Sequence, residues 1–451
     1  MQTPKALRLL WIAFFAEVGF AFLCLVFSGW IGALLVLVIL LGLLGGLGFI
    51  VRSTGIWSQN SRPPQVPNWP GQGPGPQPGP GPGPVAGWPG GNYNPAPRNR
   101  QGIGWNMNTI GNVSFNLGSY PERTEQVNLM IPLDEKTGSF VLNLTSGGVK
   151  LRGQEGLKEV RIVATKRVWA NDEMEARILL DRLRLTHTFE NGVLKVEAGD
   201  PEQGLVIGRA PRMDLDIELP PALAADLTSN YGEILTTNYN GDLVAKTNLG
   251  AIAVESYNSG RNITLNTTSG KLSLQGVAAG LVKARSGAGM IELSGVGAED
   301  LDLDSTAASI RARSINCGRY AANAVTGSLE LYDATVEGDL TMKAGAGRIH
   351  SERVTAGSLH LEATTGSVFY RGGVPKAPSE VVSRVGSVNL VFAPGTGFNL
   401  EASSNLGTVD TVLPVTGLKY QNRNSFEGQV AGGGVPVRAS SQVGSIRVTL
   451  G

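Results

Sequence analysis

Three aspartates at alternate positions are the strongest candidates for chemistry in this sequence. Asp300, Asp302 and Asp304 alternate with leucines, so in a β-strand their carboxylates would share one face. Polysaccharide-cleaving β-helix enzymes use clustered carboxylates, often with calcium and a basic residue. We favour a solvated strand face instead, and keep the three aspartates as candidates for a surface site. A second row of this kind consists of Asp214, Asp216 and Glu218.

Other chemical signatures are weak. The chain has 2 cysteines and 3 histidines, whereas a structural zinc site needs about four clustered N or S ligands. His350 and His360 fall on one coil or on adjacent coils, but no carboxylate or cysteine accompanies them at a fixed spacing. The sequence contains no nucleophile elbow, phosphate loop or repeated calcium motif. We therefore expect no catalytic residue, no metal and no cofactor.

The charge balance argues against one class of partner. Lys and Arg number 38 and Asp and Glu number 37, which leaves a net charge of +1. Proteins that bind nucleic acid normally carry a strongly basic face or tail. Nucleic acid is therefore not an expected partner.

A repeat explains why 61 of the 451 residues are glycine. Eleven turn positions, ten of them glycine, are separated by 18 to 21 residues except for a last gap of 37. An aliphatic residue lies two positions after each turn, and a small residue lies three positions before it. Two short strands with alternate side chains pointing inward, joined at a glycine turn, produce this pattern. The turns are Gly232, Gly250, Gly270, Gly289, Ala308, Gly327, Gly347, Gly366, Gly386, Gly407 and Gly444.

The repeat predicts an all-β fold, a β-solenoid (β-helix) of about eleven coils over residues 226–451. One coil cannot bury its own apolar row, but coils stacked at about 4.8 Å can. The last gap holds either a degenerate coil or a loop over residues 414–436. Because the final coil reaches the end of the sequence, we expect the loop to cover the open end of the stack. End-to-end pairing of two chains is the alternative.

Residues 105–225 read as a first β region with one helix. Residues 140–151 form two strands around a glycine turn, and Asn191 with Gly192 marks a hairpin. Asn171 or Asp172 is a typical N-cap, so one amphipathic helix is predicted over residues 172–184. Its apolar face is expected to consist of Met174, Ile178, Leu179 and Leu183.

The tandem Ser/Thr-x-x-Gly-x-aliphatic coils resemble a bacterial family of β-strand-repeat proteins of unknown function described as putative adhesins. The strand and helix of residues 160–185 and the strand of residues 214–220 also look like that family, so the resemblance spans about residues 127–451. It implies a fold rather than an activity, and surface binding only by analogy of shape. Members often accompany envelope-stress membrane proteins.

The N-terminal residues lie outside the family pattern. Residues 7–51 are almost entirely apolar, and one helix crosses a bilayer with about 20 residues. We therefore expect a transmembrane hairpin over residues 1–52, turning at residues 28–30, and a Pro/Gly-rich disordered spacer over residues 53–104. The chain would be an integral protein of the cell membrane whose partner is the lipid bilayer. The positive-inside rule favours the cytoplasmic face for the repeats, and the extracytoplasmic side stays open.

Two functions follow from these observations. The first is a non-enzymatic, membrane-anchored scaffold or adhesin-like binding module linked to the cell envelope, with an unidentified protein or glycan partner. The alternative is a carbohydrate-active β-helix enzyme that uses surface carboxylates. The first predicts no convergent polar cleft, and the second predicts carboxylates from different coils meeting in one groove.

Overall fold

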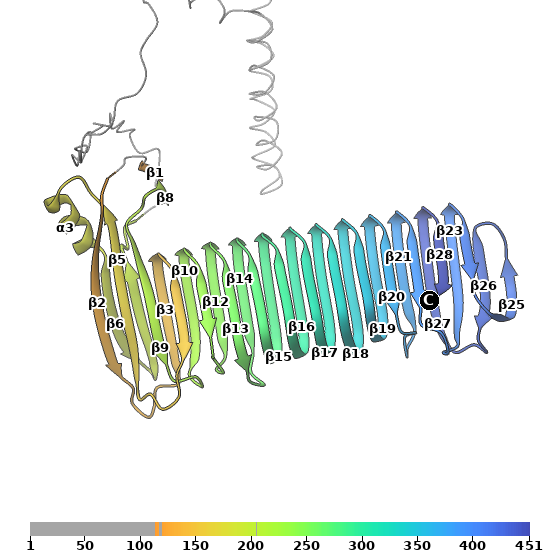
Figure 1. The fold of residues 1–451 in the computed structure, drawn as a ribbon, viewed down its shortest axis with the longest axis horizontal. Coiled ribbons are helices and arrows are strands. Elements are labelled where there is room, and N and C mark those ends of the chain that lie inside the picture. The colour runs from red at the N-terminus through yellow and green to blue at the C-terminus, as the bar shows by residue number, and fades with distance from the viewer. Residues whose placement is uncertain (1–112, 117–119, 204) are drawn as a thin grey trace, which may run out of the picture. The chain divides into compact units, whose positions relative to one another are not determined.

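The computed structural model describes residues 113–116, 120–203 and 205–451 (Figure 1). The chain divides into two compact units, Met1–Ala96 and Pro97–Gly451, and every described residue belongs to the second. The predicted hairpin of residues 1–52 and the spacer of residues 53–104 lie outside the described residues. Within the described part of the chain, no helix has the length and hydropathy needed to cross a membrane.

The predicted all-β solenoid is confirmed. Consecutive coils pair in parallel and in register, as where Ile263 lies beside Leu243 and Leu272 beside Ile252. The central strands are β10 (Ala224–Tyr231), β11 (Ile234–Thr237), β12 (Leu243–Leu249), β13 (Ile252–Asn258), β14 (Ile263–Ser269), β15 (Leu272–Ala288), β16 (Ile291–Ala307), β17 (Ile310–Thr326), β18 (Leu329–Ala346) and β19 (Ile349–Thr365).

The inward and outward columns follow the sequence pattern. Ile291, Leu301 and Leu303 are buried in one continuous apolar core that runs through the coils. Asp300 and Asp302 lie on the outer face of the same strand, β16. Alternation along the straight parts of each strand thus separates the core from the surface.

Glycine at the turns is required by close contact between coils. A Cβ added to Gly250 would lie 1.9 Å from the carbonyl oxygen of Gly232, and one added to Gly270 would lie 1.8 Å from that of Gly250. A side chain at either position would force the backbone to shift, because the neighbouring atoms are backbone, and Ala308 is the one turn residue of the eleven that carries a Cβ. The glycine column therefore reflects coil spacing.

The small residue before each turn has a polar role that the repeat pattern did not reveal. In seven coils its hydroxyl donates a hydrogen bond to the carbonyl of the glycine turn in the preceding coil of the stack, at 2.8–3.4 Å. The bond satisfies a polar group inside the stack, where an unpaired one would be costly. Ser305 breaks the rule, because its buried hydroxyl has no partner. The donors are Ser229, Thr247, Thr267, Ser286, Ser383, Ser404 and Ser441.

A second corner lies six residues after the turn and was not predicted. Seven successive coils have a left-handed backbone there, with φ of 51–63°. Small or polar residues that tolerate this conformation fill most of these positions. They are Asn238, Ser256, Gly276, Gly295, Ser314, Asp333 and Arg353.

The stack begins earlier in the sequence than the eleven predicted turns. Residues 139–153 are a full coil, with Phe140 beside Ala225 and Val149 beside Ile234. A further coil, formed by β7 and β9, pairs in parallel with its outer side. Leu144 stands where later coils carry a small residue, which hid this coil in the sequence. The strands of this end are β1 (Val113–Asn116), β2 (Glu122–Pro132), β3 (Ser139–Ser146), β4 (Val149–Gly153), β5 (Glu159–Trp169), β6 (Arg184–Glu190), β7 (Val193–Gly199), β8 (Leu205–Gly208) and β9 (Arg212–Leu219).

Antiparallel strands and one helix close this N-terminal end. β5 pairs with β9, β6 with β7, and β2 with β5, all antiparallel. The helix α3 (Glu173–Arg182) was predicted correctly, including its N-cap, where the side chain of Asp172 accepts from the backbone of Glu175 at 2.8 Å. Its predicted apolar face was wrong in part, because Met174 and Ile178 are 76% and 57% exposed. Ala176, Leu179, Leu180 and Leu183 pack toward the core instead.

At the C-terminal end, the order of the coils in space differs from their order in the sequence. The last coil, β27 with β28, pairs on one side with β21 and β22 and on the other with β23 and β24. The C-terminus consequently lies inside the stack in Figure 1. The strands are β20 (Val368–Gly372), β21 (Ser379–Val385), β22 (Val388–Phe392), β23 (Phe398–Leu406), β24 (Val409–Val412), β25 (Val415–Gln421), β26 (Ser425–Val430), β27 (Val435–Val443) and β28 (Ile446–Leu450).

The expectation that the final coil ends the stack was therefore wrong. The long gap is neither a degenerate coil nor a simple loop but a hairpin, in which β25 pairs with β26. As predicted, the hairpin covers an end of the stack, but it does so by antiparallel pairing of β26 with β23. Phe426 and Val430 of β26 are buried against the core at this end.

Candidate functional site

The three candidate aspartates lie on the outer face of β16, and two of them, Asp300 and Asp304, contact side chains of neighbouring coils. Asp300 forms an ion pair with Arg319 at 2.9 Å, and Asp304 forms one with Arg285 at 3.3 Å. Asp304 also accepts a hydrogen bond from Asn323 at 3.0 Å. In the register, Asp302 lies between Lys283 and Ala321. The structure therefore places these carboxylates in a row of coil-to-coil contacts.

The second acidic row also joins strands. Asp214 accepts from the backbone of Gly148 and pairs with Arg167, both at 2.9 Å, and Glu218 lies 3.8 Å from Arg152. These contacts connect β9 to the coil of residues 139–153 and to β5, so the acidic row has a structural role.

His350 and His360, the weak candidates for a metal pair, share no acidic partner among the described residues. His350 and His360 lie on one strand, β19. His350 is 3.6 Å from Glu352, and His360 is 4.0 Å from Glu380. Over the residues that the structure describes, no group of three or more His, Cys, Asp and Glu could hold a metal ion. Burial raises the pKa of the Cys317 thiol to about 12, so it is a poor nucleophile at neutral pH.

Two shallow hollows lie on the stack, and each is lined by a single carboxylate. One, of about 470 Å³, is lined by Lys246, Asn266, Arg285 and Asp304, and Asp304 is the single carboxylate among the residues that line it. The other, of about 420 Å³, lies beside His360. Glycoside hydrolysis commonly needs two facing carboxylates, which the first hollow does not supply.

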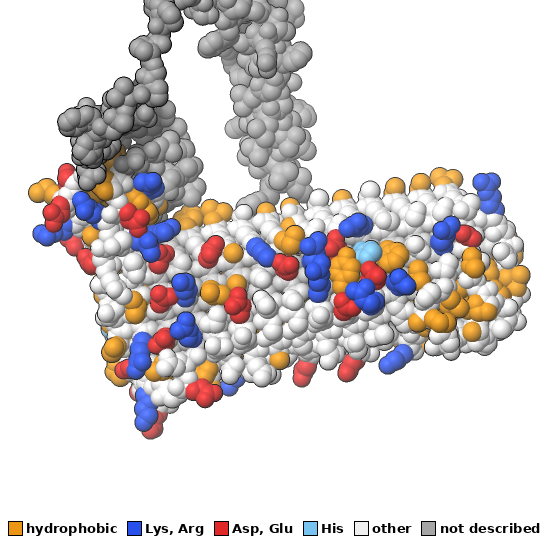
Figure 2. Space-filling model, viewed as in Figure 1, with side chains coloured by type: hydrophobic (Ala, Val, Ile, Leu, Met, Phe, Trp, Pro, Cys, Tyr) orange, Lys and Arg blue, Asp and Glu red, His pale blue; other side chains and the backbone are white. Residues whose placement is uncertain are grey.

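A different cluster stands out on the outer face of β17 to β20. Figure 2 shows hydrophobic, basic and acidic side chains gathered around a histidine on this face. We call it the arginine–aromatic patch, and its outward side chains come from the turn and the first strand of four successive coils. Its residues are Arg311, Arg313, Glu330, Tyr332, Asp333, Arg348, His350, Glu352, Arg353, Phe369 and Arg371.

Stacked rings form the centre of the patch. The ring of His350 stacks on Phe369 with centroids 4.7 Å apart and planes at 11°, and it lies 5.4 Å from the ring of Tyr332. The guanidinium of Arg313 covers Tyr332 at 5.4 Å. His350 and Phe369 therefore cover one face of each other, whereas Tyr332 and His350 are tilted at 45°.

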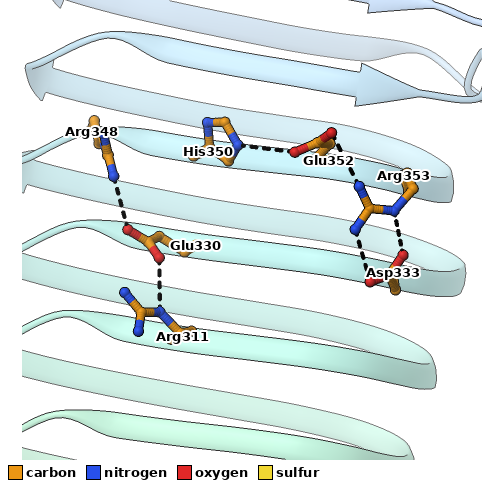
Figure 3. Close-up of polar contacts among 7 residues, drawn as sticks. All are labelled: Arg311, Glu330, Asp333, Arg348, His350, Glu352 and Arg353. Carbon is orange, nitrogen blue, oxygen red and sulfur yellow. Dashed lines mark hydrogen bonds and ion pairs between the residues drawn. The ribbon is translucent and has the colours of Figure 1, made fainter.

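Glu330 fixes two of the arginines. Its carboxylate accepts from Arg311 at 2.9 Å and from Arg348 at 3.0 Å, one on each oxygen (Figure 3). Its side chain is only 9% exposed. Burial alone would raise the pKa of Glu330, but the hydrogen bonds and charges of Arg348 and Arg311 outweigh it and hold the pKa below its ordinary value. The carboxylate therefore stays charged and orients both guanidiniums.

The other acidic groups form a second network in the patch. Arg353 contacts both oxygens of Asp333, one of them at 3.0 Å, and pairs with Glu352 at 3.1 Å (Figure 3). Hydrogen bonds and the charge of Arg353 lower the pKa of Asp333. Glu352 is therefore shared between Arg353 and His350.

Sequence reasoning missed this patch, although a signal was present. Eight of its eleven residues occupy the outward positions three and five residues after the turn, which the repeat leaves unconstrained. Arg348 follows a turn directly, and Asp333 and Arg353 stand at the second corner. Aligning those positions by coil gives Arg311, Glu330, His350 and Phe369 in one column, as the register confirms. Reading outward columns down the repeat would have placed a histidine, two rings and several arginines together.

Parallel coils of about 20 residues, an apolar core and a glycine column define this chain as a β-solenoid protein. The Toastrack DUF4097 family model matches residues 234–449, so these residues form a Toastrack DUF4097 domain. This is the β-strand-repeat family that the sequence resembles. No curated protein matches the chain.

Several solved structures are similar to this chain. A putative adhesin from Bacteroides fragilis is 10% identical, with 72% of this chain and 97% of that chain covered and a TM-score of 0.28. A putative adhesin from Parabacteroides merdae is 13% identical, with coverages of 60% and 99% and a TM-score of 0.35. A putative lipid binding protein from Parabacteroides distasonis is 14% identical, with coverages of 61% and 98% and a TM-score of 0.35. At these values the similarity carries no functional argument.

Proposed function

We propose that this protein is a non-enzymatic binding scaffold, in which a stiff stack of coils presents the arginine–aromatic patch to a protein or glycan partner. The observation that carries the proposal is the patch itself. It holds five arginines against three carboxylates, on a face where Glu330 and Asp333 already fix several guanidiniums. Arginine and aromatic residues are enriched where proteins bind partners.

We further propose that residues 1–52 anchor the scaffold in the cell membrane and that the spacer of residues 53–104 separates the two. The apolar length of residues 7–51, about twice that of one span, supports this proposal. The positive-inside rule favours a cytoplasmic stack. Adding protease to intact cells tests on which side of the membrane the stack lies, because the protease can reach the chain only if the stack is on the extracytoplasmic side.

A comparison of matched variants tests the binding role. Arg313→Ala with Arg371→Ala removes two exposed side chains of the patch, whereas Arg447→Ala removes an arginine that pairs with Asp410 elsewhere. We expect the full chain to bind envelope proteins or glycans in a saturable manner, and the double variant alone to lose this binding. Mass spectrometry should recover the ligand unchanged. A chemically converted ligand, or equal binding by all variants, would contradict the proposal.

A further inference from the structure

We infer that the ligand of the arginine–aromatic patch is an acidic segment of a partner protein. This inference rests on the proposed function, namely that the patch is a binding face. It adds the chemistry of the partner, which the charge, the ring geometry and the rigidity of the patch specify in turn.

Charge is the first argument. On most of the stack, basic and acidic side chains pair one to one between coils, as in Lys246 with Asp226 and Arg438 with Glu401. In the patch, five arginines face three carboxylates, and Glu330 is shared by two of the arginines, as Asp214 is at the N-terminal end. Arg371 is exposed and forms no ion pair among the residues that the structure describes. The patch thus has a surplus of positive charge on a protein whose net charge is only +1, and an acidic partner would neutralise it.

The identity of the cations is the second argument. All the fixed cations of the patch are arginines, whose planar guanidinium donates two parallel hydrogen bonds to a carboxylate. Arg311 and Arg348 each use one nitrogen on Glu330 and keep other N–H groups for a ligand. Because Glu330 already holds them, little side-chain entropy is lost when a ligand carboxylate arrives.

The arrangement of the aromatic rings favours a protein ligand over a glycan. Sugars bind aromatic residues by lying on an open ring face. Here Phe369 covers one face of His350, and Arg313 covers Tyr332. The edges of aromatic rings carry partial positive charge and attract carboxylate and carbonyl oxygens. A peptide with acidic side chains supplies both kinds of oxygen, from its carboxylates and from its backbone.

Fluorescence anisotropy with defined probes tests the inference on the full chain in mild detergent. The probe is a fluorescein-labelled peptide of alternating Glu and Gly, and the matched neutral peptide replaces Glu with Gln. We expect the acidic peptide to bind, the neutral one to bind at least about tenfold more weakly, and added salt to weaken binding. Arg313→Gln with Arg371→Gln should also lower affinity about tenfold or more, and the control Arg447→Gln should leave it unchanged.

Two further probes separate this inference from the proposed function. If oligogalacturonate or phosphatidylserine vesicles bind through the patch and the acidic peptide does not, the acidic-protein inference is wrong while the binding face stands. If no probe responds to the patch variants, both fail. Equal binding of the acidic peptide and oligogalacturonate would also overturn the inference, because the patch would then select charge alone.

Discussion

The middle of the stack and its C-terminal end are built from the same kind of coil, but they differ in whether coils that are neighbours in space are also neighbours in sequence. From β12 to β19 each coil lies beside its neighbours in sequence. At the end, the last coil lies between two coils that precede it in the chain. The glycine contacts are nevertheless the same, since Gly444 meets the carbonyl of Gly386 and Gly407 meets that of Gly444. The repeat therefore encodes how a coil stacks but not which coil it stacks on.

Engineered disulfides give the largest effect and test the order directly. Val385 lies beside Val443, and Val443 lies beside Leu406. Neighbouring strands bring Cα atoms to about 4.8 Å, which a disulfide can span. In a chain without its own cysteines, Val385→Cys with Val443→Cys should cross-link almost completely, as a gel shift would show.

The matched control is Val385→Cys with Leu406→Cys. These positions are two strands apart, about 10 Å, which is too far for a disulfide. They would be neighbours if the coils stacked in sequence order. A cross-link in the control and none in the first pair would contradict the order described here.

Substituting a buried residue with aspartate in each region shows how firmly that region is packed. Ile291 in the middle and Val437 in the inserted coil are both fully buried. Replacing either with Asp should lower the free energy of unfolding by several kcal/mol, roughly 3–5, because a charge would enter an apolar core. Urea denaturation measures the loss, and Asp302→Ala on the outer face should change it by less than about 0.5 kcal/mol. A much smaller effect at Val437 would show that the inserted coil is loosely held.

Added methyl groups at the turns test whether close contact is equally strict in both regions. A Cβ would lie 1.9 Å from a backbone oxygen at Gly250 and 2.2 Å from one at Gly444. We expect either change to alanine to cost about 1–3 kcal/mol, because the backbone must shift. Gly260→Ala is the control, since nothing lies within 4 Å of its added Cβ. If thermal melts show the same loss of stability for Gly260→Ala as for the other two variants, close contact between coils does not explain the glycine column.

The smallest predicted effect concerns the buried hydroxyls. Ser383 near the end donates to the carbonyl of Gly366 at 2.9 Å, whereas Ser305 in the middle has no partner. Ser383→Ala should cost about 1 kcal/mol and Ser305→Ala close to nothing. Chemical denaturation of the two variants side by side resolves this difference. A larger loss of stability for Ser305→Ala than for Ser383→Ala would show that the hydrogen bonds of the hydroxyls before the turns do not stabilise the stack.

Sequence reasoning succeeded where periodicity constrains side chains. It placed Ile291 inside and Asp302 outside because the inward position two residues after the turn is aliphatic in every coil. It predicted the two strands and the glycine turn of residues 140–151 but did not assign them to the stack, because Leu144 stands where the other coils carry a small residue. It misjudged the helix because spacing defines a face but not the side on which the core lies, and Ala176 rather than Met174 meets that core.

The candidate site was the part least accessible from sequence. The aspartate row was visible because three acids alternate in one segment, but their partners, such as Arg319, come from the neighbouring coil. The arginine–aromatic patch combines residues about 19 positions apart, such as Tyr332 and His350. Outward positions are free to vary, so no pattern within one coil marks them. The order of coils at the C-terminal end was equally hidden, because a period cannot specify a partner.

The position of the last coil also has a consequence for synthesis on the ribosome. β23 begins at Phe398, but the coil that must separate it from β21 is complete only at Leu450. At typical translation rates the intervening chain, about 50 residues, takes roughly 3–10 s to emerge. During that time β21 and β23 expose matching edges with the same inward pattern, and direct pairing would shut out the coil between them. The nascent chain must therefore delay this contact or reopen it, and the hairpin of β25 and β26, which emerges first and binds β23, occupies one of its edges meanwhile.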